Sequence, residues 1–221
     1  LVRDKGSRER LAPESAGDGA AVLSPPWRAT LWRAGLFLAI VLITFASDWR
    51  DMAWQWWNSS TYNHVLLVPA IVAWLVWQRR QDLLRIDPGL WWPPLAVFGG
   101  AILLWVLGSF AGVATARHLG VVVSMIAGLS ALLGPRMTAG LAFPLCYLLF
   151  LVPFGDELVP ALQMITAAIT ISLVDLSGIA ATINGVFIDT PAGLFEVAEA
   201  CSGVKFLIAM VAFGALVANV C

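Results

Sequence analysis

Long apolar runs separated by short polar connections constrain this chain more than any other feature. A helix needs about 20 apolar residues, or about 17 at the short end, to cross the hydrocarbon core of a bilayer. Runs that approach this length occupy residues 31–47, 62–77, 94–113, 118–133, 137–152 and 203 to the end of the chain. The pattern predicts an all-α polytopic membrane protein.

The composition excludes a soluble fold for these 221 residues. Apolar residues make up 60% of the chain and charged residues 12%, whereas about 45–50% and about 25% are usual in soluble domains. A soluble fold of this size could not cover so much apolar surface. The net charge of −1 gives no electrostatic support for nucleic-acid binding. No segment has the spacing of a metal site or a cofactor-binding loop, so we expect neither a metal nor a cofactor.

The Lys and Arg residues predict which connections face the cytoplasm. Residues 1–30 form a polar, Gly/Pro/Ser-rich segment that we expect to be a disordered cytoplasmic tail, followed by a transmembrane domain over 31–221. Basic residues also follow the second and fourth runs. Residues 137–204 contain none, but six acids. We expect that stretch to lie mainly outside. The basic residues that fix this orientation are Arg3, Lys5, Arg8, Arg10, Arg28, Arg33, Arg79, Arg80, Arg85 and Arg136.

Two weaker apolar segments, 157–180 and 184–200, leave the number of crossings open. Segment 157–180 has a polar stripe along one helical face, formed by Gln163, Thr166, Thr170 and Ser177. We therefore expect it to lie in the outer interface or to re-enter from outside, which leaves 154–200 external. A full crossing is the alternative. The chain is thus expected to form a bundle of about six to seven transmembrane helices.

Tryptophan and cysteine positions add two structural expectations. Of the 11 Trp residues, all but Trp105 fall in or near the ends of the predicted spans, which is typical of an interfacial belt. Cys146 lies inside an apolar run and is expected to be a small buried hydrophobe.

The external stretch after Gly185 has the most informative local pattern. Two short β-type runs, 185–190 and 194–199, are separated by Pro-Ala-Gly, which suits a type I turn. A β-hairpin is therefore expected directly before Cys201-Ser202-Gly203 and the last apolar helix. This arrangement presents a thiol at a helix N-terminus, on the outer membrane surface.

A thiol at that position could act as a nucleophile. Free backbone N–H groups and the positive end of the helix dipole stabilise a thiolate, and Lys205 adds positive charge nearby. Gly203 lets a substrate carbonyl approach backbone donors. The alternative is that Cys201 is a small buried residue in a helix cap, with Ser202 capping and Gly203 packing. A thiol nucleophile needs a base; the chain offers only His64 and His118, for which structural roles are expected.

Three stretches, in order, give the chain a family resemblance. They are residues 62–80 (with YNHVLLVP and WLVWQRR), 143–160 (with FLVPFGDELVP) and 195–204 (FEVAEACSGV). With these stretches the chain resembles the exosortases, most closely exosortase A, which are multipass membrane transpeptidases of Gram-negative bacteria.

The resemblance implies that Cys201 is the catalytic nucleophile. It implies attack on exported proteins with a C-terminal Pro-Glu-Pro-type sorting signal, an acyl-thioester intermediate, and transfer coupled to exopolysaccharide export. It also implies the bacterial inner membrane, with the site on the periplasmic side. The family's catalytic Arg and His lie further toward the C-terminus, and no position here matches them. We therefore expect this chain to be a fragment that lacks its C-terminal part and is inactive by itself.

Other readings remain open. One is a noncatalytic membrane component, a scaffold or transporter, of an exopolysaccharide export system. Transporters tend to have ionisable residues near the membrane midplane or internal repeats, and neither is evident here. Another is a membrane peptidase that uses Glu196 and Glu199, although no ligand His accompanies them.

Overall fold

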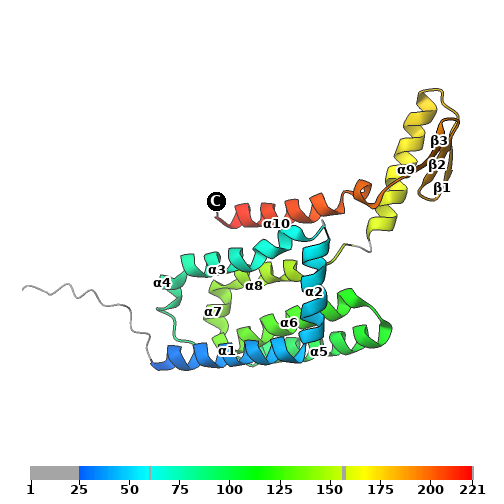
Figure 1. Cartoon of the computed structure of the whole chain (residues 1–221). Coiled ribbons are helices and arrows are strands. Elements are labelled where there is room, and N and C mark those ends of the chain that lie inside the picture. The colour runs from blue at the N-terminus through cyan, green and yellow to red at the C-terminus, as the bar shows by residue number, and fades with distance from the viewer. Residues whose placement is uncertain (1–24, 60, 156–157, 221) are drawn as a thin grey trace, which may run out of the picture.

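The computed structural model describes residues 25–59, 61–155 and 158–220. Most of them are helical, and a bundle of helices runs in one general direction, alternately forward and back (Figure 1). The bundle helices are α1 (Pro25–Thr44), α3 (Val68–Gln78), α5 (Pro93–Ala111), α6 (Ala114–Leu133), α8 (Ala142–Tyr147) and α10 (Val204–Val220). The helical elements that connect them are α2 (Ala46–Asn58), η1 (Asn63–Leu67), α4 (Arg80–Leu83), α7 (Pro135–Gly140), η2 (Leu148–Leu151) and η4 (Glu199–Ser202).

The two ends of the bundle differ. At one end lie α2, the connection between α5 and α6, and η4; at the other lie α4, α7 and the end of α10 (Figure 1). At this second end, the Arg79 guanidinium donates to the Gly140 carbonyl (2.9 Å) and to Asn219 Oδ1 (3.3 Å). Tyr147 Oη also donates to the Ala212 carbonyl at 3.3 Å. These contacts hold α10 along the length of the bundle.

Helices α5 and α6 pack closely because small residues face each other. A Cβ added at Gly120 would lie 2.8 Å from the Ala101 carbonyl oxygen and 2.9 Å from the Trp105 nitrogen. At Gly108 it would lie 2.9 Å from the Arg117 nitrogen. Without side chains at these positions, the two backbones can approach, which is how membrane helices gain packing contacts.

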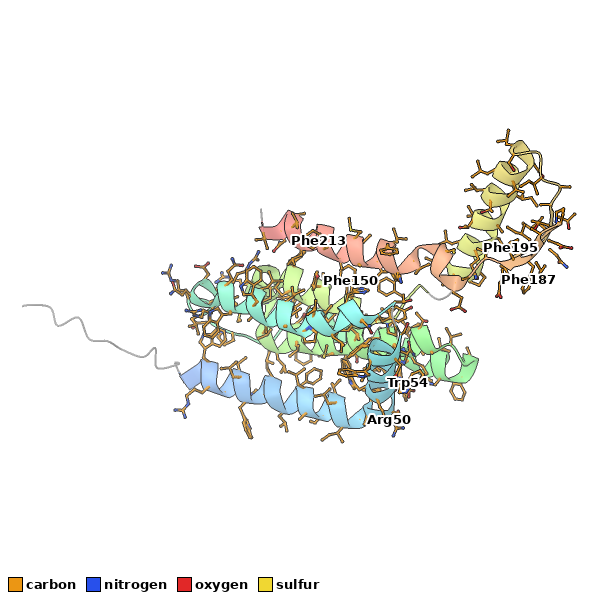
Figure 2. All side chains as sticks on the ribbon, turned by 45° about the horizontal axis from the view of Figure 1, so that its top comes forward. Arg50, Trp54, Phe150, Phe187, Phe195 and Phe213 are labelled. Carbon is orange, nitrogen blue, oxygen red and sulfur yellow. The ribbon has the colours of Figure 1, made fainter. Side chains whose placement is uncertain are left out.

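The core of the bundle combines residues from α2, η1, α6 and η2. Met52, Tyr62, Val121 and Val122 are almost fully buried there. Many large apolar side chains on the outside are exposed, such as Phe110 (88%) and Phe213 (61%) (Figure 2). In water such a surface would be unfavourable, whereas lipid solvates it. The structure is that of an all-α polytopic membrane protein.

The number of helices able to span a bilayer is lower than expected from the sequence. Among the described residues, α1, α5, α6 and α9 (Val159–Leu176) are long and apolar enough, and a fifth span results if α2 and the segment 63–78 are counted together. The chain bends by 114° between those two. The prediction of six to seven transmembrane helices counted α3, α8 and α10 as spans. These three helices are shorter than a standard span.

The predicted single span over 137–152 is wrong. The structure has three short pieces there, α7, α8 and η2. Proline lacks an N–H donor and is tolerated only in the first turn of a helix. Pro144 therefore falls in the first turn of a helix that restarts at Ala142. Cys146 of α8 is exposed, which corrects the prediction that it is buried.

Helix α9 does not join the bundle. It extends away from the end where η4 lies and runs across the direction of α10 (Figure 1). Helix α9 has the length and composition of a membrane span, and the placement of 157–180 outside the membrane stays a prediction.

The predicted hairpin is confirmed and has one more strand than expected. Strands β2 (Phe187–Thr190) and β3 (Gly193–Glu196) pair antiparallel, and Thr190 pairs with Gly193 across the Pro-Ala turn. Strand β1 (Thr182–Asn184) pairs with the other edge of β2. Gly185, at φ +63°, begins the tight turn between them. Ile188 and Val197 pack on Ala167 of α9.

Most of the predicted disordered tail lies outside the described residues. Its last part, residues 25–30, already belongs to α1. Asp156 and Glu157, among the acids expected outside, also fall on residues that the structure does not describe.

Candidate active site

Cys201 lies in η4, the single turn between the sheet and α10. Its N–H donates to the Ala198 carbonyl at 2.9 Å, and its own carbonyl accepts from Thr166 Oγ1 of α9 at 3.3 Å. Both bonds involve the backbone, and the residue is exposed. The alternative of a buried cysteine in a helix cap is therefore wrong, and the side chain is accessible for chemistry.

The turn into α10 follows the predicted capping pattern in part. The Val204 N–H donates to Ser202 Oγ at 3.4 Å, so Ser202 does cap the helix. Gly203 has φ +69°, a conformation that costs any residue with a Cβ about 1–2 kcal/mol. Among the described residues, nothing beyond its chain neighbours lies within 4 Å of where a Cβ would be. Gly203 is thus needed for the backbone and not for packing, and the space above it is open.

A cavity of about 770 Å³ adjoins this turn. That size is within the usual range for binding sites, about 300–1,000 Å³. In the sequence, Cys201 lies between Glu199 and Ser202, which both line the cavity. Cys201 itself is not one of the lining residues. The described lining residues come from the last turn of α2, the connection to η1, the start of α9, and η4 with the start of α10: Trp54, Gln55, Asn58, Ser59, Thr61, Tyr62, Val159, Pro160, Gln163, Glu199, Ser202, Val204 and Lys205.

The cavity wall mixes charges, amides and aromatic rings. Glu199 and Lys205 contribute one charge of each sign, and Gln55, Asn58 and Gln163 contribute amides. The Lys205 ammonium lies 5.3 Å from the centre of the Phe206 ring, close enough for a cation–π contact. Such a wall can hydrogen-bond a polypeptide backbone and also contact apolar side chains.

The polar stripe of α9 fixes the segment that precedes Cys201. Gln163 is 9% exposed, and its Nε2 donates to the Val197 carbonyl at 2.8 Å. One turn later, Thr166 reaches Cys201. The sequence identified the stripe but not its partner, because no local pattern indicates which segment a helix face contacts.

Neither histidine lines the cavity. His118 is 1% exposed within α6, and His64 lies partly buried in η1. The structural roles expected for both stay predictions. The structure therefore brings no histidine of the described chain into the lining of the cavity beside Cys201.

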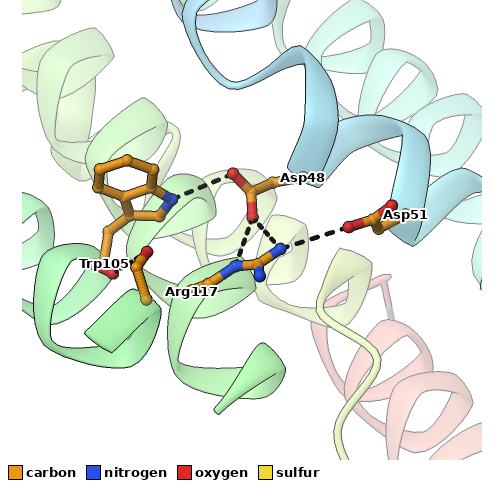
Figure 3. A network of polar contacts seen from close by, with 5 residues as sticks. Asp48, Asp51, Trp105 and Arg117 are labelled. Atoms are coloured by element: carbon orange, nitrogen blue, oxygen red, sulfur yellow. Dashed lines mark hydrogen bonds and ion pairs between the residues drawn. The ribbon is translucent and has the colours of Figure 1, made fainter. Parts of the chain in front are cut away.

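A buried ion pair anchors α2, whose last turn forms one cavity wall. Arg117 Nε donates to Asp48 Oδ1 at 2.9 Å, and Trp105 Nε1 donates to Asp48 Oδ2 at 3.1 Å (Figure 3). A further guanidinium contact reaches Asp51 Oδ2 at 3.3 Å. Sequence reasoning missed this network and took Arg117 only as the mark of a helix boundary. The sequence did contain a signal for it. Asp48 and Arg117 have opposite charges, and both lie at ends of predicted spans that face the same side of the membrane.

The predicted tryptophan belt would need exposed side chains, and several Trp residues are exposed. Trp32, Trp57 and Trp92 are about three-quarters exposed. Trp56 is different, because it is buried and its Nε1 donates to the Leu151 carbonyl at 3.0 Å. It connects α2 to η2 and belongs to the core.

Comparison with known proteins gives one match. The family model described as transmembrane exosortase (Exosortase_EpsH) matches residues 56–221. This range covers most of the chain and includes η4, α10 and all the described lining residues of the cavity except Trp54 and Gln55. No curated protein and no solved structure matches the chain.

Proposed function

This chain belongs to the transmembrane exosortase family, and from that premise we propose that it is the membrane part of a cysteine peptidase or transpeptidase with Cys201 as its nucleophile. The observation that carries the proposal is the exposed Cys201, held in one turn beside a polar cavity at the end of a membrane bundle.

The first chemical step is acyl transfer to sulfur. The Cys201 thiolate attacks the carbonyl carbon of the scissile peptide bond, the C–S bond forms, and the C–N bond breaks. The proton released by the thiol ends on the leaving amine. An acceptor amine, hydroxyl or water then attacks the thioester and regenerates the thiol. The open space at Gly203 leaves room for the substrate carbonyl beside the turn.

A base and a donor for the oxyanion are also required. The resemblance to the family implies an Arg and a His for these roles. We assign them to no residue described here, because neither His64 nor His118 lines the cavity.

The proposed substrates are exported proteins with a C-terminal Pro-Glu-Pro-type sorting signal, a hydrophobic span and a basic tail. In the exosortase A type that the chain resembles, the product passes to an acceptor linked to exopolysaccharide export. We further propose that the protein lies in the bacterial inner membrane, with Cys201 on the periplasmic side. The positions of Arg79, Arg80 and Arg85 support this orientation, because they lie where α3 ends, at the opposite end of the bundle from η4.

The experiment compares two cysteine variants of the full-length protein. Wild type, Cys201→Ala and the matched control Cys146→Ala are each expressed with a tagged protein that bears the sorting signal, and the mass of the tag is followed. Cys146 is also exposed, but it lies on α8. We expect processing by wild type and by Cys146→Ala, and none by Cys201→Ala.

Equal processing by Cys201→Ala, at a comparable amount of protein in the membrane, would remove the thiol from the mechanism. The noncatalytic scaffold would then be the better explanation. A membrane-impermeant maleimide added to cells with a permeabilised outer membrane tests the orientation separately. It should label wild type, and Cys201→Ala should lose that label.

A further inference from the structure

Helix α9 has an unusual distribution of polarity. The side that faces η4 and the sheet contains Gln163, Thr166 and Thr170, whose polar groups bond to Val197, Cys201 or the helix itself. The opposite side is exposed and mostly apolar. Its residues are Ala161, Met164, Ile165, Ala168, Ile169, Ser172, Leu173, Asp175 and Leu176.

This polarity is inverted relative to a helix on the surface of a soluble protein, where the apolar side faces inward. The exposed fractions are large, from 55% for Ile165 to 83% for Leu176. Ser172, on this side, donates to the Ala168 carbonyl at 2.9 Å. The charged residue on this side, Asp175, lies in the last turn of α9, so from Ala161 to Leu173 the face is apolar apart from Ser172.

The sheet lies on the other side of α9. Figure 1 shows β1–β3 on the side of α9 away from the bundle helices, and Phe187 and Phe195 mark the sheet in Figure 2. The outward face of the sheet is mixed: Thr182, Asn184 and Asp189 line a shallow pocket together with Phe187 and Leu194. The layers are thus the sheet, α9, and an apolar face turned toward the side on which the spans lie.

We propose that α9 lies flat along the membrane surface, with its apolar face on the acyl chains of the phospholipid leaflet and the sheet on the aqueous side. Helix α9 runs across the direction of α10 and lies at one end of the bundle. Both features suit a helix at the membrane surface. A groove along Ile165, Ala168, Ile169 and Leu173 suits an acyl chain. Interfacial helices of this kind bury their apolar face about 5–10 Å below the head groups.

This placement fixes the depth of Cys201. Its carbonyl contacts Thr166 of α9. The turn that bears the thiol therefore lies beside α9, at the same boundary between the acyl chains and water. A bond that this thiol can reach must lie within the head-group layer. The inference about α9 itself does not depend on the thiol being catalytic.

The test measures depth along the helix. Spin labels are placed one at a time at Ala161, Ala168 and Leu176 of the full-length protein, with its native cysteines replaced by alanine. The protein is reconstituted in phosphatidylethanolamine–phosphatidylglycerol vesicles. Collisions with oxygen and with a water-soluble nickel chelate give the depth. A label at Leu103, exposed on α5, is the reference for the hydrocarbon core, and one at Asp189 is the reference for water.

We expect the three α9 labels to favour oxygen over nickel several-fold more than the Asp189 label, at one shallow depth. If the Ala168 label lies as deep as the Leu103 label while the Ala161 and Leu176 labels lie at shallow depths, α9 crosses the bilayer. That result would overturn the proposal. Water-like values at all three positions would overturn it too. So would labels shielded from both reagents, which would indicate that protein covers the face. Elution of each variant as wild type from a sizing column verifies its fold.

Discussion

Arg117 Nε donates to Asp48 Oδ1 across 2.9 Å, although 69 residues separate them along the chain. The carboxylate is almost fully buried, with 2% of its side chain exposed, and 29% of the arginine side chain is exposed. Trp105 Nε1 donates a hydrogen bond to the other carboxylate oxygen, Asp48 Oδ2. One acid thus connects the starts of α2 and α6 to the middle of α5.

Replacement of Asp48 by alanine should destabilise the protein. The change leaves Arg117 without its buried partner and Trp105 Nε1 without its acceptor. Breaking a buried pair costs about 3–5 kcal/mol, and the partial exposure of Arg117 lowers our expectation to about 2–4 kcal/mol. Denaturant unfolding in detergent measures the loss.

Asp51→Ala is the matched control, because Asp51 contacts the same guanidinium but 48% of its side chain is exposed. An exposed pair contributes about 0–1 kcal/mol. Equal losses in the two variants would contradict a special role for the buried acid.

Gly120→Ala should separate α5 from α6. Its added methyl group would meet backbone atoms of Ala101 and Trp105, and backbone cannot move aside as a flexible side chain can. Overpacking of this kind costs about 1–3 kcal/mol. The same unfolding titration applies.

Gly100→Ala serves for comparison, since in the described part of the chain no atom outside the local turn of α5 lies within 4 Å of the Cβ it would add. Alanine is the better helix former by about 1 kcal/mol, so this variant should be neutral or more stable. A Gly120→Ala protein as stable as Gly100→Ala would mean that the two helices are not in close contact.

Thr166→Val should lower the rate of substrate processing. Thr166 Oγ1 donates both to Leu162 in its own helix (2.9 Å) and to the Cys201 carbonyl (3.3 Å). Loss of a single hydrogen bond is worth about 1 kcal/mol, which corresponds to roughly fivefold in rate if it loosens the turn in the transition state. Tag-mass kinetics in cells measure it.

Thr170→Val removes the equivalent bond within α9, to the Thr166 carbonyl, without contact to Cys201. Both variants should therefore be equally stable, and only Thr166→Val should be slow. Identical rates would show that Thr166 does not position the nucleophile.

The sequence predicted the parts of the fold that depend on local chemistry. Pro191 and Gly193 indicated the turn between β2 and β3, and the apolar run after Gly203 indicated α10. Strand β1 was missed although Asn184-Gly185 is a hairpin signal, because Thr182–Asn184 is too short to stand out. The break in the run over 137–152 was missed because apolarity alone does not distinguish one helix from three.

The candidate site was predictable only in part, since its walls are distant in sequence. Cys201, Ser202 and Gly203 form one local pattern, and the structure gives each a geometry consistent with it. Gln55 and Asn58 of α2 have no local signal for a site, and they line the cavity only because Asp48 and Trp56 fix their helix. Such assignments need the tertiary structure.

The walls of the cavity beside Cys201 are also synthesised in a fixed order. Its walls come from α2, then α9, then η4 with the first turn of α10. A ribosome makes the chain in that order, so α2 and α9 are synthesised before the turn that bears Cys201. The cavity therefore exists only once the first turn of α10 has been synthesised and has reached its place beside α2 and α9.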